Sequence, residues 1–270
     1  MYLTSTDLTS AKMKQQPDIL VDGMDCGIQD MTVVTPDTLL VSKITKKRVQ
    51  LVDSRKGEVL SEVQLPGAPG RMCLTDRNTA AVAMLGQKIQ MIQVKDKTLT
   101  LGRVLTVRED IYGITSRSSN LVVSYSKPRW LEVISMEGKS LHQFHTTGKT
   151  QHFKHPWFMC TTPSETILIS DWGTNKITKV DESLNILQTF TSRLLQSPHG
   201  ITVVTEDQIL VCSRGNHSLL LLQPSTNTVS TLLEEEDGIK RPWSLTYCPD
   251  RKKVYVALSY TNTIKVYQIT

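Results

Sequence analysis

The chain has 270 residues, of which 39% are hydrophobic, and it carries a net charge of +5 from 31 basic and 26 acidic side chains. This apolar content excludes an intrinsically disordered chain, and no apolar stretch approaches the roughly 18 residues that a membrane-spanning helix needs. The mildly basic balance permits an anionic partner without requiring one, and we expect no membrane partner. Self-association stays open.

The cysteines and the first residues bear on the compartment. Five cysteines, at positions 26, 73, 160, 212 and 248, are widely spaced and form no Cys-x-x-Cys pair. The segment 1–7 has neither the basic nor the apolar region of a secretory signal. We therefore expect buried free thiols and an intracellular, cytoplasmic protein.

A short apolar pattern recurs six times along the chain. Its copies begin at Val49, Ile89, Leu131, Ile177, Leu219 and Ile264, at steps of 40, 42, 46, 42 and 45 residues. Self-similarity at this period is typical of four-stranded propeller blades. The sequence therefore predicts an all-β, six-bladed β-propeller of four-stranded antiparallel blades.

The predicted elements follow one order in every blade. Residues 1–27 form a lead-in, and blades begin near Ile28, Pro69, Ile111, Pro156, Pro198 and Pro242. An innermost strand is followed about ten residues later by an apolar second strand, then by the repeated pattern and a weaker outer strand. No segment keeps a 3.6-residue period, so we expect almost no helix. Residues 1–270 are interpreted as one propeller domain.

The two ends of the chain predict how the ring closes. The sixth copy stops at Thr270 after its third strand, whereas Ala11 and Met13 alternate with polar neighbours in the segment 10–16. A strand from this segment would cover an otherwise open sheet edge. We therefore expect an N-terminal strand to complete the last blade.

The later copies carry a recognisable motif. Pro198–Ile201 reads Pro-x-Gly-Ile, a second strand ends at Asp171, and Asn175 and Asn262 begin Asn-x-Ile patterns. In these features the chain resembles NHL-repeat propellers, in particular the C-terminal domain of tripartite-motif proteins, including many invertebrate versions.

This resemblance implies a recognition module of a ubiquitin ligase, not the ligase activity itself. The chain shows no zinc-ligand ladder of a RING or B-box and no coiled-coil heptads. We accordingly expect no enzyme activity in these residues.

Two sets of loops are predicted to share one face: those entering the first strands and those joining second to third strands. The candidate partner-binding residues on this face are Lys47, Arg48, Lys88, Arg129, Trp130, Trp172, Lys176, His199, Arg214 and His217. Aromatic side chains mixed with cations suit a protein hot spot and equally suit single-stranded RNA. A structural interpretation stands beside both: Trp157 and Trp243 would wedge between blades, and Asn175 and Asn262 would close turns.

Three functions therefore remain. Binding of a protein partner leads, single-stranded RNA binding is the alternative, and a metal-dependent hydrolase or lyase is the third. The histidines that could suggest a metal, His152, His155, His199 and His217, occupy different repeat positions and are not expected to converge. We assign no catalytic residue, metal or cofactor. The acidic run 234–237 would oppose nucleic-acid binding if it faced the basic loops.

Overall fold

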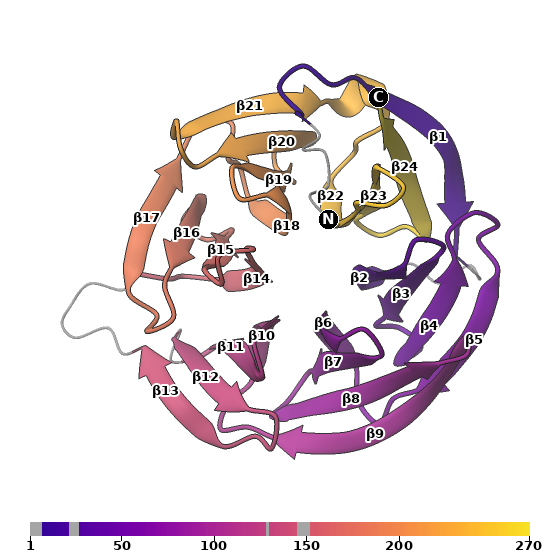
Figure 1. Cartoon of the computed structure of the whole chain (residues 1–270), viewed down its shortest axis with the longest axis vertical. Coiled ribbons are helices and arrows are strands. Elements are labelled where there is room, and N and C mark those ends of the chain that lie inside the picture. Colours follow the sequence, from indigo (N-terminus) through magenta and orange to yellow (C-terminus); the bar gives the residue numbers. More distant parts are fainter. Residues whose placement is uncertain (1–6, 22–26, 128–129, 145–151) are drawn as a thin grey trace.

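The computed structural model describes residues 7–21, 27–127, 130–144 and 152–270. Six four-stranded antiparallel sheets stand around a central axis (Figure 1). The predicted six-bladed propeller is confirmed. In the described part of the chain the helical content is one 3-10 turn, Glu235–Asp237, which lies between the last two blades.

Each blade runs from the axis outward in four strands. The first strands line the axis: β2 (Ile28–Thr35), β6 (Pro69–Asp76), β10 (Ile111–Arg117), β14 (Pro156–Thr161), β18 (Pro198–Thr205) and β22 (Pro242–Cys248). The second strands are β3 (Thr38–Lys43), β7 (Thr79–Met84), β11 (Asn120–Tyr125), β15 (Ile167–Asp171), β19 (Gln208–Ser213) and β23 (Lys253–Leu258).

The outer half of each blade contains the repeated apolar pattern and an edge strand. The third strands are β4 (Arg48–Asp53), β8 (Lys88–Lys95), β12 (Leu131–Ser135), β16 (Lys176–Val180), β20 (Ser218–Gln223) and β24 (Thr263–Ile269). The outer strands are β5 (Val59–Gln64), β9 (Thr98–Thr106), β13 (Ser140–Phe144), β17 (Ile186–Thr191), β21 (Thr228–Leu233) and β1 (Met13–Leu20).

Burial explains the sequence patterns of the strands. Every residue of β3 and β15 is buried. Such strands have neighbouring blades against both faces, so they appear as short continuous apolar runs. Outer strands such as β21 mix exposed and half-buried residues because one edge faces water.

The N-terminal strand closes the ring as predicted, but three residues later than expected. β1 pairs antiparallel with β24 from Met13 opposite Ile269 to Leu20 opposite Thr263, and the register shifts between Gln16 and Ile19. Pro17 lies in this irregularity of an edge strand, where its missing N–H breaks no ladder bond. Lys12 and Thr270 extend the pairing through two backbone hydrogen bonds of 3.2 and 3.0 Å.

No helix in the described ranges is long and apolar enough to span a bilayer.

Candidate functional site

The same irregularity begins all six first strands. Each strand shifts register against its neighbour immediately after its first residue. A β-bulge bends the strand and redirects the side chain that it leaves unpaired. The residues in these bulges are Gln29, Gly70, Arg71, Tyr112, Trp157, His199, Gly200 and Trp243. The bulges therefore supply the side chains at one mouth of the central channel.

We call the face around this mouth the loop face. It consists of the strand openings and of the loops 44–47, 85–87, 172–175, 214–217 and 259–262. The opposite turn face consists of the turns that join first to second and third to fourth strands. The two faces are distinct because every strand of an antiparallel blade reverses direction.

An arginine closes the mouth at the loop face. The Arg71 guanidinium carbon lies 3.7 Å from the ring centre of Phe158, 4.9 Å from that of Trp157 and 5.0 Å from that of Trp243. The His199 ring centre lies 4.6 Å from that of Trp243. We call these five residues the arginine–aromatic cluster, in which cation–π attraction replaces part of the hydration that the guanidinium loses.

Backbone and carboxylate groups of β2 fix this cluster. The Gln29 carbonyl accepts hydrogen bonds from Arg71 Nη1 and, at 3.0 Å, from Trp243 Nε1. Asp30 is buried, and its carboxylate accepts from the N–H groups of Met31 and Met72, both at 2.9 Å, and from the Ser244 hydroxyl at 2.6 Å. Burial raises the pKa of Asp30, while it lowers the pKa of Arg71 to about 9.

Two glycines allow the first strands to approach each other here. A Cβ on Gly113 would lie 2.6 Å from the Trp157 carbonyl oxygen, and a Cβ on Gly200 would lie 2.8 Å from Ser244 Cα. These contacts are closer than side chains allow, so glycine at these positions brings neighbouring blades together beneath the cluster.

A second group of rings extends the cluster to the surface. Trp172 stacks on His155 with ring centres 4.1 Å apart and planes 7° apart. Tyr112 lies 6.0 Å from His155 and 5.9 Å from Trp157. Asp171 holds the loop by accepting the backbone N–H groups of residues 154, 155 and 173 at 2.6, 2.8 and 2.9 Å. Tyr112, Trp157 and Trp172 are half-buried, so the loop face presents aromatic surface to solvent.

The predicted lysines lie on the same face as this aromatic surface. Lys47, Lys88 and Lys176 are exposed at the starts of third strands in blades one, two and four, and none makes an ion pair within the described residues. Arg214 is half-buried; its guanidinium carbon is 5.7 Å from the Trp243 ring centre, and its Nε donates to the Ser259 hydroxyl at 3.1 Å. Arg129 lies outside the described residues.

Three other predicted residues are occupied by contacts within the protein. Arg48 is buried and pairs with Glu62 at 2.9 Å, which joins β4 to β5. Trp130 packs on Tyr125 with ring centres 5.6 Å apart. His217 Nδ1 lies 3.3 Å from a Glu235 carboxylate oxygen.

His199 also requires a correction, because its side chain is 2% exposed. Its Nδ1 lies 2.8 Å from the Ser197 carbonyl oxygen, and burial lowers its pKa to about 3. His199 is therefore a neutral ring packed beneath the surface. Arg48 is likewise buried in an ion pair, so neither side chain is available to bind a partner.

Asn175 has a structural role, although its side chain bonds the segment that enters the next blade and not its own turn. Asn175 adopts a left-handed φ of 55°, and its side-chain oxygen accepts the Ser197 N–H at 2.8 Å. Trp157 and Trp243 pack between blades, as the structural interpretation states, and both also remain half-exposed.

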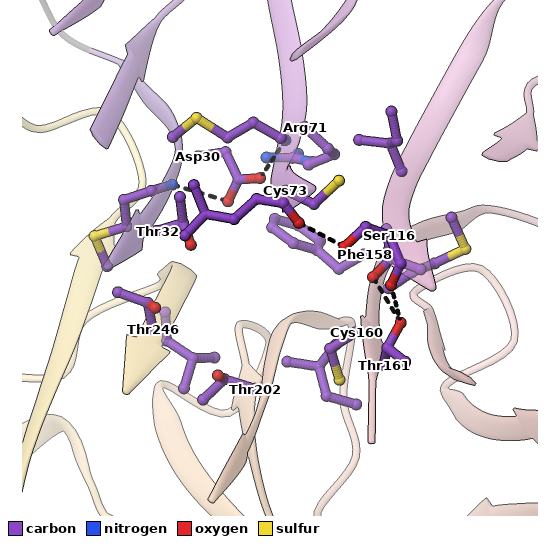
Figure 2. Close-up of a pocket in the computed structure, with 18 residues that line it drawn as sticks. Asp30, Thr32, Arg71, Cys73, Ser116, Phe158, Cys160, Thr161, Thr202 and Thr246 are labelled. Carbon is purple, nitrogen blue, oxygen red and sulfur yellow. Dashed lines mark hydrogen bonds between the residues drawn. The ribbon is translucent and has the colours of Figure 1, made fainter. Parts of the chain in front are cut away.

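Sequence reasoning missed the interior of the channel. Asp30, Arg71 and Phe158 line a cavity of about 230 Å³ that extends from the cluster along the first strands (Figure 2). The signal was present in the alignment of the six openings, because the fifth residue of each first strand is small and polar or a thiol. These residues are Thr32, Cys73, Thr115, Cys160, Thr202 and Thr246.

The described residues contain no group of three or more His, Cys, Asp or Glu side chains placed to hold a metal ion. Cys73, Cys160, Cys212 and Cys248 are free thiols, and burial raises the pKa of each. Thiols of this kind are poor nucleophiles, since the thiolate is the reactive form.

Comparisons with known proteins bear on the fold alone. The sequence matches no protein-family description and no curated protein. A structural genomics protein of unknown function from Bacteroides thetaiotaomicron superposes with a TM-score of 0.74 at 13% identity, covering 97% of this chain and 74% of that one.

Two further structures are similar. The β-propeller domain of Cps50 (Swd1) from Myceliophteria thermophila has a TM-score of 0.67 at 14% identity and covers 93% of this chain and 86% of its own. A streptogramin B lyase has a TM-score of 0.67 at 12% identity, over 96% of this chain and 98% of its own. All three structures share the propeller fold with this chain.

Proposed function

We propose that this propeller is a non-catalytic recognition module that binds a protein partner on its loop face. From the resemblance to tripartite-motif propellers, we further propose that the partner is a protein presented for ubiquitination. The observation that carries the proposal is the half-buried aromatic surface of Tyr112, Trp157 and Trp172, bordered by exposed lysines.

The composition of this surface matches an interaction hot spot. Large aromatic rings supply contact area at low cost in side-chain entropy, and an immobile support keeps them ready for binding. Support comes from below: Trp157 packs on Arg71 and on Trp243, whose ring centre is 5.3 Å away. Lys47, Lys88 and Lys176 add positive charge at the edge, which favours a partner with an acidic segment.

The acidic run 234–237 favours protein over RNA. Glu235 lies beside His217 of a loop-face loop and 3.5 Å from Lys240, so this run borders the same face. Three glutamates and an aspartate at the edge would repel a phosphate backbone that crosses it. A folded protein can place its own lysine or arginine there.

The test compares two matched charge reversals on the full chain. One variant carries Lys47→Glu, Lys88→Glu and Lys176→Glu on the loop face. The other carries Lys56→Glu, Lys97→Glu and Lys252→Glu, which are exposed on the turn face. Each variant changes the net charge from +5 to −1, because three reversals remove six charges.

Both variants and the wild type capture proteins from nuclease-treated extract, and bound proteins are quantified by mass spectrometry. We expect at least one protein to be lost about tenfold or more with the loop-face variant and retained with the turn-face variant. Equal retention by both variants would contradict the proposal.

The alternative function, RNA binding, is tested with the same wild-type and variant proteins. We expect fluorescence anisotropy with single-stranded RNA at low salt to give the same result for the wild type and the loop-face variant. A measurable affinity that falls steeply with salt and disappears in that variant would replace the protein proposal with the RNA one.

A further inference from the structure

Residues from the same register position of all six blades line the wall of the central cavity. The fifth residue of every first strand contributes a threonine hydroxyl or a cysteine thiol to it (Figure 2). Thr115 and Thr161 hydrogen-bond each other at 3.1 Å. Thr32 and Thr202 face the cavity with hydroxyl groups that make no hydrogen bond within the described residues. The wall thus offers free polar groups that belong to no blade-to-blade contact.

One charged group at the end of this cavity is incompletely paired. Arg71 is 1% exposed, and its Nη1 donates to the Gln29 carbonyl. Its Nε and Nη2 are buried, and neither has a hydrogen-bond partner. A guanidinium normally uses all five N–H groups, and leaving donors of a charged group unpaired in the interior is costly. The site therefore lacks an acceptor for one edge of Arg71.

Asp30 is not that acceptor. Its oxygens accept from Met31, Met72 and Ser244, and no direct ion pair joins it to Arg71. Burial raises its pKa, which weakens it as a permanent counter-ion. The guanidinium carbon lies 3.7 Å from the ring centre of Phe158, and an aromatic ring supplies no carbonyl or carboxylate acceptor. The Nε–Nη2 edge is thus buried without an acceptor among the described residues.

We propose that the cavity binds a small carboxylic acid, whose carboxylate accepts from Nε and Nη2 of Arg71 and whose remaining polar group contacts Thr32 or Thr202. Two parallel N–H···O bonds from one guanidinium edge match the two oxygens of a carboxylate. This ligand supplies the missing acceptor.

Charge and size restrict the ligand class. Among the described residues that line the cavity, Arg71 is the single cationic side chain. One positive group beside Asp30 can compensate a monoanion but not a phosphate dianion. The volume of about 230 Å³ lies below the range of about 300–1,000 Å³ that is usual for larger organic ligands. A short hydroxy acid fits these limits.

This inference goes beyond the proposed function and is separable from it. Arg71 and Phe158 line the cavity, whereas Trp157 does not line it and is half-buried at the loop face, so a bound acid and a protein partner contact different residues. Loss of one activity therefore leaves the other measurable.

The test is isothermal titration calorimetry on the full chain with acetate, glycolate and lactate. Glycolamide and lactamide are the neutral controls, and inorganic phosphate is the alternative anion. We expect at least one acid to bind with a Kd of about 10 mM or tighter, and the matching amide and phosphate to bind at least about tenfold more weakly.

Three variants assign the binding to the cavity. Arg71→Met keeps an apolar stem against Phe158 and should weaken binding more than about tenfold, whereas Arg71→Lys keeps the charge and should lie between it and wild type. The double variant Thr32→Val/Thr202→Val removes both candidate hydroxyl groups and should weaken binding of a hydroxy acid without affecting the fold, so it decides the matter if Arg71→Met does not fold. Lys176→Ala on the loop face should bind as wild type does.

The proposal fails if no acid binds the wild type at 10 mM. It also fails if amides or phosphate bind as well as the acids. Wild-type affinity for a hydroxy acid in Thr32→Val/Thr202→Val would equally overturn it, as would wild-type affinity in a folded Arg71→Met.

Discussion

At the residue scale, burial decides the role of the histidine at the channel mouth. His199 follows an opening proline and looks exposed in the sequence, yet the bulge turns it beneath Trp243. Its neutral ring donates from Nδ1 to the Ser197 carbonyl. Arg71 and Arg214, which face it, add to the burial that disfavours its protonation.

This burial predicts a pH dependence of stability. The pKa of His199 falls from the ordinary 6.5 to about 3 on folding, so the unfolded chain binds one more proton between these values. The free energy of unfolding should therefore decrease as the pH falls from 6.5 toward 3, by up to about 1.4 kcal/mol per pH unit from this group.

Urea unfolding of wild type and His199→Phe between pH 7 and 4 checks this expectation. Phe keeps a ring against Trp243 but cannot titrate, so the wild type should lose stability more steeply than the variant. Asp30, whose raised pKa acts in the opposite sense, is present in both proteins and cancels. Parallel curves would show that His199 is accessible to protons in the folded state.

The sequence predicted register positions better than side-chain environments. Lys47, Lys88 and Lys176 are exposed on the expected face. Arg48 and His199 occupy the expected positions but are buried, because pairing across β4–β5 and the bulge of β18 depend on neighbouring strands. Arg71 could not be identified from the sequence because its contacts are with Gln29, Phe158 and Trp243, which belong to three other blades.

At the element scale, the closing strand shows how local chemistry sets a register. The alternation of Ala11 and Met13 indicated a strand, but its pairing with β24 begins at Met13 and continues past Pro17. After the irregularity, Ile19 is 4% exposed and joins the core, whereas Leu20 is 72% exposed. Adjacent residues of similar size therefore have opposite environments.

This contrast makes a matched pair of substitutions. Ile19→Ala should lower the free energy of unfolding by about 2–5 kcal/mol, because it leaves a cavity between the last blade and the first. Leu20→Ala should change it by less than about 0.5 kcal/mol. Chemical denaturation of both variants provides the measurement. Equal effects would mean that β1 does not pair in this register.

The blade boundaries were predictable because one opening pattern occurs six times along the chain. The first strands begin at Ile28, Pro69, Ile111, Pro156, Pro198 and Pro242, where the spacing placed them. The bulge after each opening residue was not predictable. It depends on how closely neighbouring first strands approach, which Gly113 and Gly200 permit.

At the scale of the whole molecule, the ring gives the protein two unlike faces. The loop face is covered by rings and cations over the arginine–aromatic cluster, and beneath it the first strands enclose a cavity lined by hydroxyls and thiols. Repetition produces the hydroxyl and thiol layer directly, because each blade contributes one residue from the same register position. The proposed partner site and the proposed carboxylate site therefore follow one another along the axis of the ring.

Hydrogen–deuterium exchange on the propeller, with and without a captured partner, tests the central claim that recognition occurs on the loop face. The account predicts slower exchange on binding in the loops 44–47, 85–87, 172–175, 214–217 and 259–262, with the turns 77–78, 96–97 and 249–252 unchanged. Protection confined to those turns or to the outer strands would contradict it.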